Sequence, residues 1–558
     1  MKILQYCDDT TLLLNSLDEL PEAFDNISQF YKISGLKLNI NKSIGFGIGS
    51  SKDILGNPGN LHWKSKDEIT KILGIHFNSM QEASDIEENW IPKLEKIKEL
   101  AIKLQRRPVS LWGKVLLCKT FLLSQLSFTI QALSMPTKYI QELETICFKF
   151  IWHKQNEKKT IERIKRQVMC LDKDDGGAGM IKGGSQQKLF LIKWILKVGE
   201  GNFKSIFCTS KIPDIYFSHV GGIDYFFSIT CPYSKLPTSD LLTRFWKDAI
   251  QSWLVFKHNI KIFHNSKPTN LKDIFGTLPQ DRIPLFLNPE IVFGPEPLFH
   301  HGWMKCDFKY LHQIMDENGG VKDFNLLPDS ITTLPDSIFM LNALKLGFSK
   351  VKRQRESPID FLRENQLMPG KILKIPNNIL RSIIELDPAL EPLGMKFWKR
   401  KLELDIFPKY ISSLRSLNET KLQVTLFKLF HNIQPSKIML KKWNLEESDR
   451  CDCGEIDFID HSLVTCNYLD PLWNEVKQII IVSTGERIQL TLSSKLFGLS
   501  MEDGKNLNIN NNSLSIINNI LLIAKFSINK ARSEKSDILL CFESEWNFRK
   551  DQIMNKYS

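Results

Sequence analysis

Residues 5–11 read QYCDDTT and place two adjacent carboxylates between short β-prone segments. Neighbouring side chains of a strand point to opposite faces, so Asp8 and Asp9 can serve one site only if a tight turn separates two strands. Ile3–Tyr6 and Thr11–Leu14 fit as the arms of that hairpin. Carboxylates on a rigid turn suit Mg²⁺, although such pairs are also common in solvated turns. The stretch predicts a hairpin and is typical of a two-metal nucleotidyl-transfer site.

Three features follow the acidic pair in a fixed order. Leu20–Ile33 has the apolar spacing of an amphipathic helix that ends at Gly35. Leu36–Lys42 alternates as a strand does, and Ile72–Phe77 is a short apolar strand interrupted by glycine. This order of elements strengthens the interpretation of the acidic pair as part of a nucleotidyl-transfer site.

With these features the chain resembles the reverse transcriptases of non-LTR (LINE-type) retrotransposons. YCDD at 6–9 is similar to the family's third catalytic motif, with Cys7 where the family usually has Ala. GLKLN at 35–39, together with Lys42, is similar to the fourth motif. LGI at 73–75 is similar to the fifth, the primer-grip hairpin.

The resemblance implies roles for three residues. Asp8 would be the principal Mg²⁺ ligand, Asp9 its partner, and Lys42 would lie near the incoming triphosphate. From the residues alone, Lys42 reads as a solvated lysine at a strand end. The implied reaction is RNA-templated DNA synthesis from a nicked target, with an RNA template, a DNA primer or target and deoxynucleotides as partners.

The family carries its first catalytic aspartate on a strand well upstream of the hairpin, with the fingers. Only seven residues precede Asp8 in this sequence, so we expect the chain to have neither that aspartate nor an upstream endonuclease domain. A two-metal site needs carboxylates from both strands. We therefore expect that this chain does not polymerise alone.

Positive charge is concentrated in residues 91–170, which contain 16 Lys or Arg and 6 Asp or Glu, within a net charge of +11 for all 558 residues. This pattern indicates a polyanion partner, but a solvated helix surface explains the charge equally well. The 42% hydrophobic and 25% charged content is ordinary for a globular protein of three or four domains.

The acidic pair interrupts the first apolar stretch, so no signal peptide is visible. Thr120–Thr137, a long uncharged run, is too polar and short for a membrane span, and we expect a buried helix. Eleven scattered cysteines indicate free thiols in a reducing compartment. We expect an intracellular protein, nuclear or cytoplasmic, that is not secreted and has no membrane partner.

Trp90–Phe150 has helical periodicity, with a first helix that ends at 105–108 and a second that Ser110 caps. In the family this region forms the thumb that clamps the template–primer duplex, and LWGKV at 111–115 is similar to it. We expect Arg106, Arg107 and Lys114 to contact backbone phosphate.

FKFIW at 148–152 and the basic cluster Lys158–Arg166 are also similar to the family, and the cluster has the composition of a nuclear localisation signal. GGAGM at 176–180 lacks the context of a phosphate loop and is expected to be a turn. Residues 200–440 look mostly helical and resemble the family's connector. His300, His301 and Cys306 match no metal-site spacing and are expected to be structural.

Cys451-Asp452-Cys453, seven residues, His461, four residues and Cys466 supply three thiolates and one imidazole for a tetrahedral Zn²⁺. We expect His461 and Cys466 one helical turn apart, and Cys451 and Cys453 on one face of an extended backbone. The resemblance extends to the family's Cys-Cys-His-Cys knuckle. The family separates its first two cysteines by two or three residues rather than one, so a decayed knuckle is the alternative. Four flanking residues are expected to cover it: Trp443, Leu445, Trp473 and Val476.

Asn506–Asn519 is expected to be a flexible linker, followed by helices over Ile516–Lys530 and Asp537–Lys550. The predicted fold is α+β and predominantly α-helical. Its expected segments are a partial palm (1–85), a helical thumb (86–200), a helical connector (201–440), a zinc-knuckle-like module (441–480) and a C-terminal linker with helices (481–558).

Two functions remain open: a LINE-type reverse transcriptase fragment, or a non-catalytic nucleic-acid-binding protein that uses the basic thumb and the knuckle. An untranslated relic is a third reading. The sequence does not indicate the oligomeric state.

Overall fold

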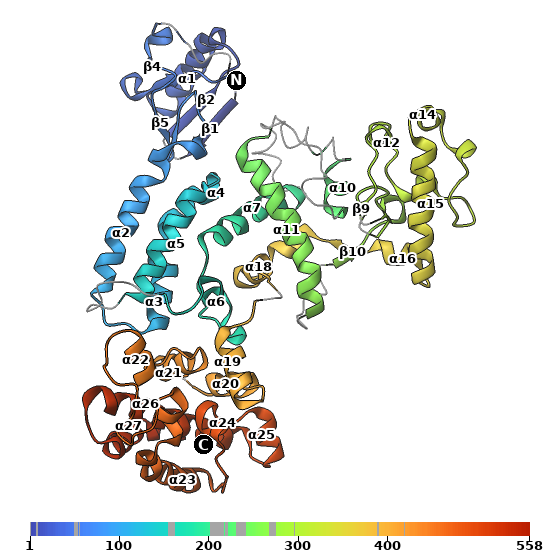
Figure 1. The fold of residues 1–558 in the computed structure, drawn as a ribbon. Helices are drawn as coiled ribbons and strands as arrows, with labels where there is room; N and C mark the ends of the chain where they lie inside the picture. Colours follow the sequence, from blue (N-terminus) through green and yellow to red (C-terminus); the bar gives the residue numbers. More distant parts are fainter. Residues whose placement is uncertain are drawn as a thin grey trace. The chain divides into compact units, whose positions relative to one another are not determined.

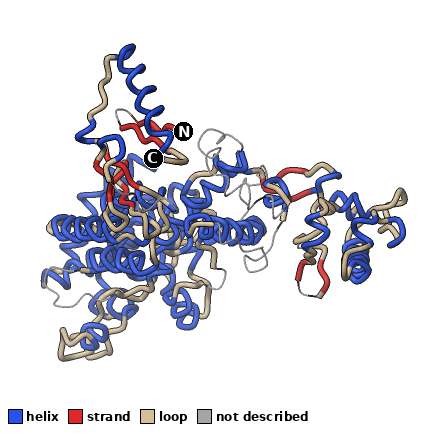
Figure 2. The backbone as a smooth tube through the Cα atoms, turned by 90° about the horizontal axis from the view of Figure 1, so that it is seen from above, coloured by secondary structure: helices blue, strands red, loops and turns tan. Residues whose placement is uncertain are grey.

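The computed structural model describes residues 2–6, 9–49, 54, 56–153, 162–200, 217, 221–229, 242–266, 275–288, 290–294, 296–387, 390–417 and 419–557. Helices predominate and the sheets are small and two-stranded, which confirms a predominantly α-helical α+β fold (Figures 1 and 2). The chain forms two compact units. Unit 1 comprises 1–96, 126–142 and 184–384, and unit 2 comprises 97–125, 143–183 and 385–558.

Unit 1 begins with the expected hairpin. Strands β1 (Lys2–Tyr6) and β2 (Asp9–Leu13) are antiparallel, and Tyr6 pairs with Asp9. Only two residues of the chain separate the paired ends, and the two strands confirm the predicted hairpin. Cys7 and Asp8, which follow Tyr6 in the chain, lie outside the described residues.

The next elements confirm one prediction and correct another. Helix α1 (Leu20–Ser34) ends at Gly35, whose φ of 73° is the left-handed conformation of a helix C-cap. The strand expected over Leu36–Lys42 is wrong, because the Asn39 side chain accepts the Lys42 N–H at 3.2 Å and starts a 3₁₀ turn (Ile40–Lys42). The strand comes later, as β3 (Ile44–Phe46), parallel to β4 (His62–Lys64).

The glycine-interrupted segment is itself a hairpin. Strands β5 (Thr70–Ile72) and β6 (Ile75–Phe77) pair around Leu73 and Gly74. Both turn residues have positive φ, 46° and 84°, as a two-residue primed turn requires. The glycine is therefore a turn residue rather than an interruption within one strand.

The rest of unit 1 is mostly helical, as expected for residues 200–440 within the described ranges. Trp253, Phe286 and Trp303 are fully buried in its core. Two small antiparallel strand pairs lie among the helices. One joins β7 (Phe275–Thr277) to β10 (Glu364–Leu367), which are distant in the chain, and the other is the hairpin of β8 (Val292–Phe293) with β9 (Glu296–Pro297). The helices include α4 (Ser127–Ala132), α7 (Gly183–Glu200), α10 (Ile223–Ser228), α11 (Arg244–Ser266), α12 (His301–Lys305), α13 (Leu311–Ile314), α14 (Asp329–Thr332), α15 (Ser337–Gln354), α16 (Pro358–Arg363), α17 (Pro369–Leu373) and α18 (Asn377–Ile384).

Unit 2 packs around helix α26 (Asn511–Glu534), which contacts α20, α21, α23 and α27. Its residues Ile517, Ile520 and Ile523 are fully buried. The other helices of this region are α2 (Ile91–Gln105), α3 (Leu111–Leu117), α5 (Thr137–Trp152), α6 (Arg166–Cys170), α19 (Leu393–Leu402), α20 (Phe407–Ser416), α21 (Thr420–Phe430), α22 (Lys437–Lys442), α23 (Asp470–Thr484), α24 (Leu492–Phe497), α25 (Met501–Asn506) and α27 (Ile538–Tyr557). The helices expected near the C-terminus are confirmed, and both are longer than predicted.

The flexible linker expected over Asn506–Asn519 is wrong. The Asn510 side chain accepts the Ser513 N–H at 2.8 Å and caps α26. Asn518 is buried and bonds the backbone N–H and C=O of Leu499 at 2.7 and 3.1 Å. Because these asparagines satisfy backbone groups, their abundance reflects helix capping and buried hydrogen bonds.

Leu111–Ala132 forms one helical run through α3, a π-helical turn, a 3₁₀ turn and α4. Among the described residues it alone is long and apolar enough to cross a membrane, a test that core helices also pass, and 39% of its apolar stretch is buried. The expected buried helix is therefore only partly observed. Leu122 and Leu126 are buried, whereas Phe121 and Phe128 are exposed.

Candidate metal centre

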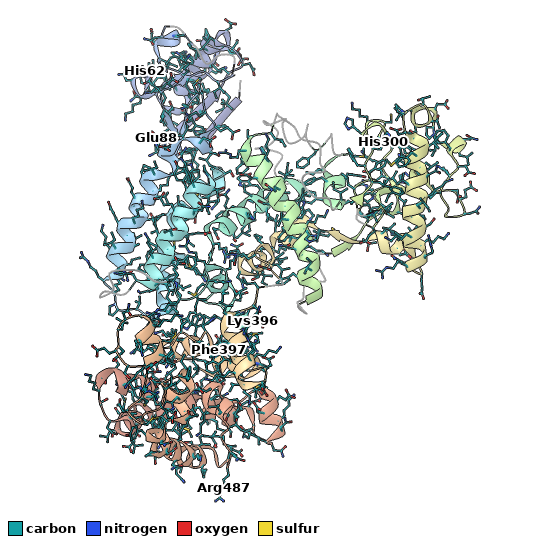
Figure 3. The ribbon with its side chains drawn as sticks, in the orientation of Figure 1. His62, Glu88, His300, Lys396, Phe397 and Arg487 are labelled. Atoms are coloured by element: carbon teal, nitrogen blue, oxygen red, sulfur yellow. The ribbon has the colours of Figure 1, made fainter. Side chains whose placement is uncertain are left out.

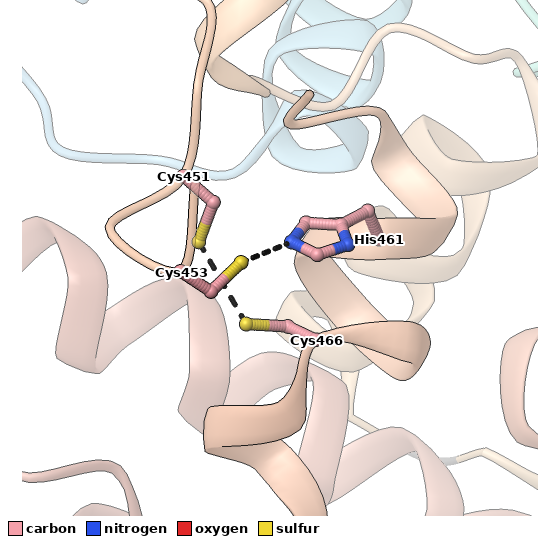
Figure 4. A group of neighbouring side chains, drawn as sticks. All are labelled: Cys451, Cys453, His461 and Cys466. Atoms are coloured by element: carbon pink, nitrogen blue, oxygen red, sulfur yellow. Dashed lines mark hydrogen bonds between the residues drawn. The ribbon is translucent and has the colours of Figure 1, made fainter. Parts of the chain in front are cut away.

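The first two cysteines lie at the tip of a tight turn between Arg450 and Ile456, which form an antiparallel bridge (Figure 4). The Cys451 N–H donates to the Glu455 carbonyl at 2.8 Å, and the Gly454 N–H donates to the Cys451 carbonyl at 2.9 Å. Gly454 has a φ of +90°. The extended backbone expected for Cys451 and Cys453 is thus wrong, because this turn brings the two sulfurs together across a single residue.

The second half of the centre is a π-helical turn, His461–Thr465. The Cys466 N–H donates to the His461 carbonyl at 3.1 Å, so the bond joins residues five apart. At about 3.6 residues per turn, an α-helix would rotate two such residues well away from each other. The π turn keeps both ligands on one face, and the expected spacing of one turn is confirmed in this wider form.

All four ligand atoms lie within 4.8 Å of one another. The Cys451 and Cys466 Sγ atoms are 3.7 Å apart, and Cys453 Sγ is 3.2 Å from His461 Nε2. A tetrahedral Zn²⁺ with Zn–S bonds of about 2.3 Å separates its sulfurs by about 3.75 Å. The four residues therefore fit a metal such as zinc.

The surroundings of Cys451 and Cys466 shift the pKa values of their thiols in opposite directions. Burial raises the pKa of Cys466 to about 12. Burial also opposes ionisation of Cys451, but hydrogen bonds from the Cys453 backbone and the His461 side chain outweigh it and lower the pKa of Cys451 to about 7. Since metal ligands bind deprotonated, loading the centre releases protons from this group of side chains.

A buried carboxylate links the metal-binding loop, residues 445–470, to the rest of unit 2. The Asp457 side chain is fully buried, accepts from the Arg532 guanidinium on α26 at 3.0 Å and accepts the Lys437 N–H at 2.8 Å. Sequence reasoning missed Asp457, which reads as one more acidic residue of a polar loop. Only its burial distinguishes it.

The expected covering residues are confirmed in part. Trp473 and Val476 are buried in the core against which Cys451 and Cys453 pack, and Trp443 is half-buried. Leu445 is 62% exposed, so its prediction is wrong. Its N–H bonds the Leu440 carbonyl at 2.9 Å, and the residue therefore belongs to the surface turn that ends α22.

The loop around the centre is acidic. Residues 445–470 contain eight Asp or Glu and one Arg. Three thiolates and one imidazole would leave a bound Zn²⁺ with a further net negative charge. Four of these carboxylates, those of Asp449, Asp452, Asp457 and Asp460, pair with Lys or Arg from outside the segment. The remaining four leave the segment with an acidic excess, in contrast to the basic residues 91–170.

The predicted Mg²⁺ ligands are not assembled into a site among the described residues. Asp9 is exposed at the start of β2, Asp8 lies outside the described ranges, and Lys42 is exposed in its 3₁₀ turn. In the part of the chain that the structure describes, the Cys/His group alone brings three or more metal-ligating side chains together. Metal binding by Asp8 and Asp9 stays a prediction.

The predicted phosphate contacts fall into two kinds. Arg106 and Arg107 are exposed directly after α2. Lys114 instead is half-buried, donates to the His153 carbonyl at 2.7 Å and has its pKa lowered by burial. Ser110 caps α3 as expected, its Oγ accepting the Gly113 N–H at 3.2 Å. Lys114 thus has an internal structural contact that the sequence did not reveal.

The basic cluster at 158–166 is described only from residue 162. There Arg166 pairs with Glu162 at 2.5 Å, and the Arg163 guanidinium lies 4.4 Å from the centre of the Trp443 ring. Both arginines therefore have partners within unit 2.

Two further predictions are confirmed. The predicted turn is confirmed at Gly176 and Gly177, where the Gly177 N–H donates to the Asp172 carbonyl at 2.9 Å, and His431 Nε2 lies 2.7 Å from the Gly176 carbonyl oxygen. His300, which is labelled in Figure 3, accepts the Trp303 N–H at 3.2 Å and contacts the Pro335 carbonyl, as expected for a structural residue. Cys306 donates to the Ser330 carbonyl at 3.7 Å. The role of His431 was not apparent from the sequence, because its partner lies far away in the chain.

No protein-family model matches the chain.

Proposed function

We propose that this chain is a nucleic-acid-binding protein of LINE-type reverse transcriptase ancestry. Its basic helices within residues 91–170 contact phosphate, and a zinc ion stabilises unit 2. The observation that carries the proposal is the separation of charge between residues 91–170 and 445–470. Phosphate contacts need positive charge such as that of the first segment and are opposed by negative charge such as that of the second.

The ancestry rests on the order of motifs along the chain. Two local structures support it: the antiparallel pairing of β1 with β2, and the primed turn between β5 and β6. A short hairpin tip is what an aspartate pair needs to present both carboxylates in one direction.

A separate argument makes the chain non-catalytic by itself. Two metal ions about 4 Å apart need carboxylates from more than one strand. Among the described residues, Asp9 belongs to no group of three metal-ligating side chains. The chain would then retain the binding part of the ancestral function without the chemistry.

The zinc proposal rests on the ligand geometry given above. Three thiolates and one imidazole close the tetrahedron and leave no open position for substrate, which is the pattern of a structural site. Because Asp457 accepts a hydrogen bond from Arg532 on α26, a metal that orders the loop would also stabilise the packing of the loop against this helix.

Binding is tested with the 558-residue chain and a labelled RNA hairpin in a salt titration. We expect the logarithm of the association constant to fall linearly with the logarithm of the salt concentration. Binding that is independent of salt would overturn the phosphate-contact proposal.

Catalysis is tested separately by primer extension on an RNA template with deoxynucleotides and Mg²⁺. We expect no product. Extension that the substitution Asp8→Ala abolishes would establish reverse transcriptase, the second candidate function, for this chain.

A further inference from the structure

We propose that the metal centre is also a thiol-oxidation site, at which a hydroperoxide joins Cys451 to Cys466 in a disulfide and the metal is released. The inference concerns the pairing of three specific sulfurs. It holds whether or not the chain binds nucleic acid.

The pairing follows from the arrangement of the ligand atoms. Cys451 and Cys466 have their sulfurs 3.7 Å apart, whereas Cys453 Sγ lies against His461 Nε2 at 3.2 Å (Figure 4). A disulfide needs the sulfurs at about 2.05 Å, so a small side-chain movement suffices for the first pair. Cys453 Sγ also interacts with the other two sulfurs, but it lies against the His461 imidazole at 3.2 Å, and we expect this contact to keep it a free thiol.

Burial sets the order of the steps. Cys451 is half-buried at the tip of its turn, whereas Cys466 is only 5% exposed. Of the two paired thiols, Cys451 is therefore the one that a small peroxide reaches first, and the buried Cys466 resolves the product; Cys453 is half-buried like Cys451 but lies against the His461 imidazole.

The chemistry balances with hydrogen peroxide as the two-electron oxidant. The Cys451 sulfur attacks one peroxide oxygen, the O–O bond breaks, and the leaving hydroxide is protonated to water; the other oxygen stays as the sulfenic acid. The Cys466 sulfur then attacks the sulfenic sulfur, the S–O bond breaks, and a second water leaves. Two thiols and one peroxide become one disulfide and two waters, and the metal ion departs without a change of charge.

Loss of the metal follows from the ligand count. After oxidation, one thiol and one imidazole remain, which is half of a closed tetrahedral set. The disulfide would replace the metal as the link between the turn at Cys451 and the π turn that ends at Cys466.

The test treats the full chain with hydrogen peroxide, in zinc-loaded and metal-free form, and then alkylates the remaining thiols. Cleavage after Arg450 and Lys477 leaves all the ligands on one peptide, and further cleavage after Glu455 separates Cys451 and Cys453 from Cys466. We expect a disulfide-linked pair of peptides with the alkyl group on Cys453. We also expect zinc release from the loaded form, followed with a chromogenic chelator.

Three variants sharpen the test. Cys453→Ser should still form the cross-link after peroxide, and Cys451→Ser should lose it. Cys541→Ser on α27, outside the metal centre, should behave as wild type. Should a variant fail to fold, the wild-type peptide map still decides the pairing.

A link from Cys453 to either other cysteine, oxidation to sulfinic acid without a cross-link, or zinc retention after cross-linking would each overturn the proposal. A chain that forms the expected cross-link but does not bind RNA would support this inference and contradict the proposed function. The two failures are therefore distinguishable.

Discussion

The Asp457 carboxylate accepts a hydrogen bond from the Arg532 guanidinium at 3.0 Å, and this contact joins the metal-binding loop to the central helix α26. Asp457 is fully buried, and Arg532 is about one-third exposed. The second carboxylate oxygen accepts the Lys437 N–H. One side chain therefore links the loop to both α22 and α26.

Replacing Asp457 with Asn should destabilise unit 2 by about 3 kcal/mol, because it removes one charge of a buried ion pair. Urea unfolding of the zinc-loaded protein, followed by circular dichroism, measures the effect. Asp452→Asn is the matched control, since Asp452 pairs with Lys437 but is 84% exposed. It should cost less than about 1 kcal/mol, and equal costs for the two variants would contradict the anchoring role of Asp457.

Removal of the metal should lower the free energy of unfolding of unit 2. A site that binds zinc only in the folded state contributes about 4 kcal/mol when free zinc exceeds the dissociation constant by about a thousandfold. We expect a chelator to lower the melting temperature of the wild type. Cys466→Ser should melt at the lower temperature with or without chelator, whereas a wild type insensitive to chelator would exclude a structural zinc.

His431 should make the protein sensitive to mild acid. Its burial lowers the pKa to about 4, against a contrary effect of its bond to the Gly176 carbonyl. The unfolded chain takes up this proton near pH 6.5 and the folded chain only near pH 4, so stability is lost as pH falls through this window. The loss reaches about 3 kcal/mol when the pH is below the folded pKa.

The check compares urea unfolding of the wild type and His431→Gln across that window. Gln can still donate to the Gly176 carbonyl but does not titrate. The variant should lose less stability than the wild type as the pH falls. Identical pH dependence in the two proteins would contradict the assignment to His431.

The sequence predicts local structure well where one residue type has one physical reason to be there. Ser110 as a helix cap, Gly35 as a helix end and the hairpin around QYCDDTT at 5–11 are of this kind. The Asn-rich segment misleads because composition alone does not show that Asn518 meets the backbone of Leu499, which is set by packing.

For the metal centre, too, the sequence predicted the residues but not the backbone conformation that brings them together. Residue types and spacing were enough to find its four ligands. The tight turn at Cys451 and the π turn after His461 were not predictable, because each depends on hydrogen bonds that close only in the folded loop. Asp457 and His431 were missed since their partners are distant in sequence.

Two glycines of the segment 176–180 differ in the space around their Cα atoms. A Cβ at Gly177 would collide with the Leu171 backbone carbonyl, whereas a Cβ at Gly179 meets nothing within 4 Å. Gly179 has a φ of +66°, so alanine there carries only backbone strain, about 1 kcal/mol. We expect Gly177→Ala to cost about 3 kcal/mol in urea unfolding, and a smaller cost than that of Gly179→Ala would contradict the packing.

The nucleic-acid contact is tested most directly by two adjacent arginines. Arg106 and Arg107 are exposed directly after α2. If each neutralises one phosphate, replacing both with alanine should reduce the slope of the logarithm of affinity against the logarithm of salt concentration by about 1.4 on single strands and about 1.8 on a duplex.

The control is Lys399→Ala with Arg400→Ala, an exposed basic pair at the end of α19, which removes the same net charge outside residues 91–170. Electrophoretic mobility shifts at several salt concentrations provide the slopes. An equal reduction in both double variants would mean that net charge alone governs binding. A reduction confined to Arg106 and Arg107 would assign the phosphate contact to the end of α2, since only local ion release distinguishes the two pairs.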